Sequence, residues 1–203
     1  FGAEKFKKLR NVIVNSAFLS AVIALALLVC GQLSASWILG ILHTPQDVLP
    51  DTMQYMRMIF WGIPIVMAYN LLASILRSLG DGKTPLYAML CASVVNIGLD
   101  LLFVPILRFG VVGAAAATVL AQGCSCLICL FKIRKISILR FHRKDCVLLP
   151  ALHVRLMALG MPMAFQNAVI SVGGMIVQSV INGFGVIFIA GFTATNKLYG
   201  MLE

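Results

Sequence analysis

The sequence has few charged residues and very few acidic ones. Of its 203 residues only 11% are charged, and seven are aspartate or glutamate, whereas charged residues make up about a quarter of a soluble domain. Hydrophobic residues account for 61% of the chain, and the mean hydropathy is +0.98. Such a chain cannot cover a folded surface with polar groups. A soluble protein is therefore excluded, and we expect lipid to be the solvent.

Paired metal ligands and exposed basic patches are also missing. Cys124, Cys126 and Cys129 lie inside one apolar run, without a second pair of Cys or His at zinc-finger spacing, so we interpret them as packing residues. The net charge of +9 comes from basic residues confined to short segments between apolar runs, which is not typical of nucleic-acid binding. We expect no metal, no cofactor and no nucleic-acid partner.

Long apolar runs are what the sequence does contain. Six of them are long enough to cross a bilayer core of about 30 Å, although the last is incomplete. They cover residues 12–42, 57–79, 85–107, 111–131, 154–181 and the stretch from 186 onward. The sequence therefore predicts an all-α polytopic membrane protein, with about five complete transmembrane helices and part of a sixth. Because the chain begins with Phe1 and its last run is cut short, we expect it to be an internal fragment of a longer protein.

Basic residues occupy every second connection between these runs. They precede the first run, flank the turn at 80–84, and are most frequent in the loop 132–153. This alternation is the positive-inside pattern of multi-pass proteins of the cell membrane. It predicts that the start of the chain and the loop 132–153 face the cytoplasm.

The loop 132–153 is the single long polar connection, so it predicts a boundary between two helical bundles. We expect residues 1–131 to form an amino-terminal lobe and residues 154–203 to begin a carboxy-terminal lobe, with the loop 132–153 between them.

An acidic residue lies inside the third apolar run. Burying Asp100 in a bilayer costs about 3 kcal/mol, which favours a functional role. Asn96 and Ser93 precede it at helical spacing, while Thr118 and Gln122 follow the same spacing on the next run. Asp100 and Thr118 each stand nine residues from the turn near 109, about 13 Å along a helix. The two stripes can therefore face each other as a polar ladder that also includes Ser125.

A carboxylate in this setting can couple ion binding to conformation. Desolvation raises its affinity for a proton, and a bound cation reverses the preference for the neutral form. Asn96 and Thr118 would add neutral oxygens that Na⁺ also accepts, so H⁺ and Na⁺ both stay open as coupling ions. Gln166 and Asn167 on the fifth run are candidates for a substrate path. For all of these neutral groups, hydrogen bonding between helices is the alternative interpretation.

Three ordered motifs resemble the multidrug and toxic compound extrusion (MATE) family. They are the segments 76–85 (LRSLGDGKTP), 96–100 (NIGLD) and 110–118 (GVVGAAAAT). The segment 1–4 (FGAE) is similar to the end of a family segment after its second helix, and 159–162 (LGMP) to the start of its seventh.

The resemblance implies twelve helices in two six-helix lobes around a central cavity, of which this chain would hold helices three to seven and part of the eighth. It implies a monomeric antiporter in lipid that exports amphipathic or cationic drugs and toxic compounds, driven by inward H⁺ or Na⁺ flow. One branch of the family has a cation site that matches Asn96, Asp100 and Thr118. Its remaining acid, on the first helix, would lie outside this chain.

Two other classes of function stay open. A lipid-linked saccharide flippase of the same superfamily would carry basic residues within its spans, but here only Lys197 lies in a run away from its ends. An intramembrane enzyme would need a second carboxylate, a basic partner for a serine, or clustered metal ligands in the spans. Away from their ends, the five complete runs contain none of these, so we predict that the protein is not an enzyme.

Overall fold

The computed structural model describes residues 6–41, 49–136, 149–182, 191–192 and 195, and this part of the chain contains helices and no strand. The elements are α1 (Phe6–Ile41), α2 (Leu49–Ser78), α3 (Lys83–Leu101), the π-helix η1 (Leu102–Ile106), α4 (Gly110–Arg134) and α5 (Pro150–Asn182). Within these described residues, five spans are long and apolar enough to cross a membrane, with α3 and η1 forming one of them. The predicted all-α membrane fold is confirmed. The predicted run from 186 onward lies almost wholly outside the described residues.

Two helices begin earlier than the sequence predicted. Helix α2 starts at Leu49 rather than at 57, so that Asp51 falls in its first turn, where an acidic group interacts favourably with the helix dipole. Pro50 is also suited to the start of a helix, because the first backbone N–H groups have no partner within the helix. Helix α1 starts at Phe6 rather than at 12 and runs for 36 residues. It is therefore about 54 Å long, well beyond the thickness of a bilayer core.

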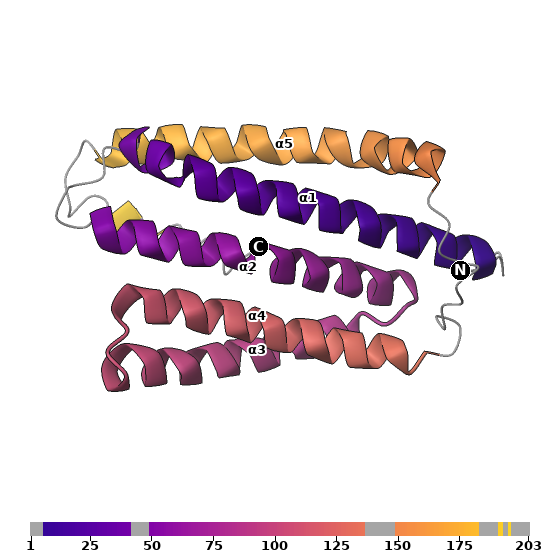
Figure 1. Cartoon of the computed structure of the whole chain (residues 1–203), viewed down its shortest axis with the longest axis horizontal. Coiled ribbons are helices and arrows are strands. Elements are labelled where there is room, and N and C mark those ends of the chain that lie inside the picture. The colour runs from indigo at the N-terminus through magenta and orange to yellow at the C-terminus, as the bar shows by residue number, and fades with distance from the viewer. Residues whose placement is uncertain (1–5, 42–48, 137–148, 183–190, 193–194, 196–203) are drawn as a thin grey trace. The chain divides into compact units, whose positions relative to one another are not determined.

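The chain divides into two compact units, residues 1–153 and 154–203. In the first unit the helices form a row in the order α1, α2, α4, α3, in which each helix packs on the next (Figure 1). Basic residues lie at the start of α1, around the turn between α2 and α3 and in the last turn of α4. These three places are at the same end of the helix bundle, measured along the helix axes. We refer to this as the basic end. That the two units correspond to the two predicted lobes stays a prediction.

Small residues let α4 approach both of its neighbours closely. Gly113, Ala115, Ala117 and Ala121 are all buried, and such small residues permit close approach between helices in a membrane. On α2, a Cβ atom at Gly62 would lie 2.6 Å from a methyl group of Val119. Near the basic end, Cys129 fills the core between Leu76, Ile75, Ala88 and Ile133, as expected of a packing cysteine.

The turn between α2 and α3 shows why the segment LRSLGDGKTP contains glycine, aspartate and threonine at these positions. Gly80 adopts φ +89°, and the backbone N–H groups of Gly80 and Asp81 donate to the carbonyls of Arg77 and Leu76, which closes the end of α2. The Asp81 carboxylate then accepts hydrogen bonds from the backbone N–H (3.0 Å) and hydroxyl (2.7 Å) of Thr84 at the start of α3. These bonds, more than Lys132 at 3.7 Å, lower the pKa of Asp81.

The carboxy-terminal end of the third span is irregular. Residues 102–106 form the π-helix η1, which contains Pro105, and its bonds run from the N–H of Leu107 to the carbonyl of Leu102 and from Phe109 to Phe103. Arg108 and Gly110 adopt φ values of 53° and 57°, so the chain reverses within a few residues. A π-helical turn holds more residues than an α-helical turn. The side chains of α3 that face α4 are therefore not the ones obtained by counting back from the loop along a regular helix.

Candidate cation site on α3 and α4

Asp100 lies in the last turn of α3, and its side chain is half-buried. Its Oδ1 atom is covered completely and has no hydrogen-bond partner among the described residues. The other acidic residues in the described part of the chain are the exposed Asp51 in the first turn of α2 and Asp81 in a turn. Asp100 is thus the one acid placed inside a described span beyond its first turn.

Two further covered polar atoms lie on the same pair of packed helices. Asn96, one turn before Asp100 on α3, has its Nδ2 atom covered, and Gln122 on α4 has its Oε1 atom covered. Neither atom has a partner among the described residues. Leaving a buried polar group unpaired costs about 1–3 kcal/mol, and more if it is charged. The atoms of Asp100 and Gln122 are oxygens that a bound cation could satisfy, whereas Nδ2 of Asn96 is a donor that needs an acceptor. We call Asn96, Asp100 and Gln122 the orphan triad.

Thr118 is oriented differently from the orphan triad. Its side chain is exposed in the described part of the chain, and its hydroxyl donates a 3.0 Å hydrogen bond to the carbonyl of Ala114 on its own helix. A threonine hydroxyl bonded in this way still has lone pairs that can accept a further contact. Its predicted role as a cation ligand stays a prediction.

The polar ladder does not form in the predicted register where Ser93 and Ser125 were expected to pair. The hydroxyl of Ser93 is exposed and donates to the carbonyl of Met89 on its own helix, at 3.1 Å. Ser125 is buried instead against α3, where its hydroxyl donates to the carbonyl of Ala88 at 3.0 Å. The predicted register was obtained by counting equal numbers of residues from the loop along α3 and α4, which is valid only if both helices are regular. The π-helix η1 adds residues to one side only, which explains the different pairing.

The remaining predicted residues lie in the second unit. Gln166 and Asn167 are exposed on α5, and their predicted place on a substrate path stays a prediction. Lys197 lies outside the described residues.

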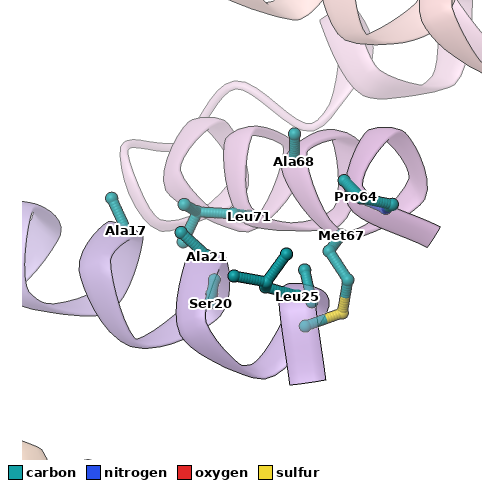
Figure 2. A pocket seen from close by; sticks show the side chains of 9 residues that line it. Ala17, Ser20, Ala21, Leu25, Pro64, Met67, Ala68 and Leu71 are labelled. Atoms are coloured by element: carbon teal, nitrogen blue, oxygen red, sulfur yellow. The ribbon is translucent and has the colours of Figure 1, made fainter. Parts of the chain in front are cut away.

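A cavity of about 480 Å³ lies between α1 and α2, next to Pro64 (Figure 2). Small and apolar side chains line it, among them Ala17, Leu25, Met67 and Leu71. Ser20 contributes the one polar side chain of this lining, and no charged group takes part. The cavity offers almost nothing to a cation and is separate from the orphan triad.

Sequence reasoning missed a fully buried polar residue on α1. Asn15 is 0% exposed, and its side chain bonds to the backbone of Asn11 and of Leu149. The signal was available, because two asparagines one turn apart flank an apolar stretch near the start of α1. The partner at Leu149 could not be found from spacing, since 134 residues separate the two positions.

Comparison with known proteins shows the relationship. The sequence profile of the MatE family matches residues 1–102. The chain is 34% identical to the probable multidrug resistance protein YpnP of Bacillus subtilis (strain 168) over 166 residues, which cover 79% of the chain and 36% of that protein. It is 26% identical to the probable multidrug resistance protein YoeA of the same organism, over all of the chain and 46% of that protein. The chain thus spans less than half the length of these relatives.

The fold agrees with this relationship. A crystal structure of a MATE protein in the bent conformation superposes with a TM-score of 0.82, at 24% identity, over 95% of this chain and 44% of that one. At this identity the superposition shows the fold alone. With the profile match over half of its residues and five spans of membrane length, this chain belongs to the MatE family of membrane transporters.

Proposed function

We propose that this chain carries the coupling-ion site of a secondary antiporter, which exports amphipathic or cationic compounds in exchange for inward flow of H⁺ or Na⁺. The observation that carries the proposal is the orphan triad, in which Asn96, Asp100 and Gln122 each place a covered polar atom without a partner in the described part of the chain. Relatives named as probable multidrug resistance proteins support export as the direction of transport.

The chemistry follows from the cost of those unpaired groups. A charged carboxylate in a span is unfavourable, so it gains from a proton or from a metal cation. Protonation turns Asp100 into a neutral group with one donor, while Na⁺ needs oxygen ligands, which Asp100, the side-chain carbonyls of Asn96 and Gln122, and Thr118 would supply. In either case the ion removes the penalty in one conformation more than in another, and this difference couples its flow to a conformational change.

The same proposal sets the orientation of the protein. The basic end of the first unit would face the cytoplasm of a cell membrane, in agreement with the positive-inside rule. Lipid surrounds the spans and the amphipathic substrate is the other partner, so a single copy of the protein suffices for transport. No step of this mechanism makes or breaks a covalent bond in the substrate, and we propose no enzymatic activity.

The test is transport in vesicles that contain the whole purified protein. A proton gradient and a sodium gradient are imposed separately, and the movement of a fluorescent cationic dye is recorded. We expect dye movement under one of the two gradients, and we expect Asp100→Asn to abolish the dependence on it. Asp51→Asn is the matched control, because Asp51 is an exposed acid in the first turn of α2.

The outcomes separate the alternatives. Equal gradient dependence in the Asp100→Asn variant and the parent would remove Asp100 from the mechanism. Loss of dependence in both acid variants would point to a general effect of charge rather than to this site.

A further inference from the structure

At the basic end of the first unit, a buried side chain of α1 binds the backbone just before α5. The Nδ2 atom of Asn15 donates to the carbonyl of Asn11 at 2.8 Å, and its Oδ1 atom accepts from the N–H of Leu149 at 2.8 Å. Asn15 is fully buried. A hydrogen bond to a buried, oriented amide is specific, because a slight displacement of Leu149 would break it.

Leu149 is the residue immediately before α5. Its carbonyl accepts the N–H groups of Leu152 (2.9 Å) and His153 (3.2 Å), which are the first bonds of the helix. The first N–H groups at a helix start have no partner within the helix. Asn15 supplies an acceptor for the N–H that precedes this turn, so α1 contributes to the amino-terminal end of α5.

A second contact lies one turn further along both helices. The rings of Phe18 and His153 are 5.7 Å apart between centroids and inclined at 37°. Phe18 follows Asn15 by three residues, and His153 follows Leu149 by four, so the two contacts lie side by side on α1 and on the first turn of α5. One contact would allow that turn to pivot, whereas two fix its direction as well as its position.

The boundary between the two compact units falls at this place. The first unit ends with His153 and the second begins with Val154, although α5 is continuous from Pro150 to Asn182. The first turn of α5 therefore belongs to the first unit and the rest of the helix to the second. Pro162, which follows Gly160 in the second unit, interrupts the backbone bonding of α5 at a position where helices bend.

We propose that Asn15 and Phe18 form a clamp that holds the first turn of α5 on α1, so that the two units move relative to each other by bending α5 between His153 and Pro162. Asn15 is then a positioning residue, which acts through the backbone of Leu149. Because the clamp holds the first turn of α5, the movement starts within this helix and not in the loop that precedes it. This limits the directions in which the second unit can move.

The first test measures the contact itself. Hydrogen–deuterium exchange is followed for the segment that contains Leu149, in the whole protein in lipid nanodiscs. We expect Asn15→Leu to raise the exchange rate of the Leu149 amide by roughly fivefold, as expected for the loss of one hydrogen bond, and Asn15→Asp to restore protection because it keeps the accepting oxygen. Asn70→Leu, at an exposed position of α2, is the control and should change nothing there. Unchanged exchange in Asn15→Leu would overturn the clamp.

The second test asks whether the clamp positions the units. Spin labels are placed at the exposed Ser36 on α1 and Ser171 on α5 in a background without native cysteines, and the distance distribution is measured by double electron–electron resonance. We expect a broader distribution in Asn15→Leu than in the parent, and recovery in Asn15→Asp. Faster exchange with an unchanged distribution would reduce the clamp to local packing and overturn its positioning role.

If Asn15→Leu does not fold, Phe18→Ala removes the second contact and is tested by the same two measurements. Neither readout depends on an ion gradient, so failure of the clamp and failure of the proposed cation site are distinguishable.

Discussion

The hydroxyl of Ser125 on α4 and the carbonyl oxygen of Ala88 on α3 are joined by a hydrogen bond of 3.0 Å. Ser125 is 1% exposed, so this bond sets the register of the two helices that carry the orphan triad. We expect Ser125→Ala to lower the free energy of unfolding by about 0.6 kcal/mol, the average for such bonds in membranes. Thermal unfolding in detergent measures the change. Ser93→Ala is the control, because the exposed Ser93 bonds only within its own helix, and an equal loss in both variants would contradict the assigned role.

The contact of Gly62 with Val119 predicts that α2 and α4 tolerate no larger residue there. A Cβ atom at position 62 would lie 2.6 Å from the Val119 methyl group. We expect Gly62→Ala to lower the free energy of unfolding by about 1–3 kcal/mol, because overpacking forces the helices apart. The double variant Gly62→Ala, Val119→Ala should recover most of that loss.

Gly123→Ala is the matched control for this prediction. Gly123 lies on α4, and nothing comes within 4 Å of a Cβ atom built there. Alanine favours a helix over glycine, so we expect unchanged or slightly higher stability. A loss equal to that of Gly62→Ala would show that the close approach is not the cause.

The turn at Asp81 predicts a defined dependence of stability on pH. Hydrogen bonds from Thr84 lower the pKa of Asp81 in the folded protein, so folding favours the charged form. The resulting stabilisation is complete above the ordinary aspartate pKa of about 3.9 and is lost as the pH falls through the lowered pKa of the folded state. We expect Asp81→Asn to be less stable than the parent at neutral pH. The difference in unfolding temperature should shrink below about pH 3.9.

Thr84→Val provides the control for Asp81. It removes the hydroxyl that donates to Asp81 at 2.7 Å while keeping the backbone N–H. In the double variant the two losses should not add, because both report on the same contact. Additive losses would place the effect of Asp81 elsewhere.

Gln122 predicts opposite effects on stability and transport. Its Oε1 atom is covered and has no partner among the described residues, so Gln122→Leu removes an unpaired polar group. We expect the variant to be more stable to heat by about 1 kcal/mol, and to need a higher concentration of the coupling ion for half-maximal transport. Such a trade-off between stability and activity is common at functional sites. A variant that loses stability and keeps its ion dependence would show that Gln122 only joins helices.

The fold could be predicted because each span has to hide its backbone from lipid along its full length. This need produces long apolar runs, and it made α3, α4 and α5 visible in the sequence to within a few residues. The starts of α1 and α2 were placed too late. The first two turns of these helices carry the charged residues Lys8, Arg10 and Asp51, and hydropathy does not distinguish a helix that leaves the membrane from a polar loop.

The candidate site could be predicted in part. The cost of a carboxylate in lipid identified Asp100, and helical spacing placed Asn96 beside it. The pairing of α3 with α4 could not be counted from the loop, because the π-helix at Pro105 changes the number of residues per turn. Nor could the contact of Asn15 with Leu149 be foreseen, since the two positions are 134 residues apart.

The row of helices in the first unit has a mechanical consequence. Helices α1 and α3 stand at opposite ends of the row, and α2 and α4 lie between them (Figure 1). A displacement that begins at Asp100 on α3 would reach Asn15 on α1 through three successive interfaces, and the contact of Gly62 with Val119 forms part of the middle one. The interface between α2 and α4 is thus the closest contact along this path. A looser packing there would weaken the mechanical coupling of Asp100 to Asn15.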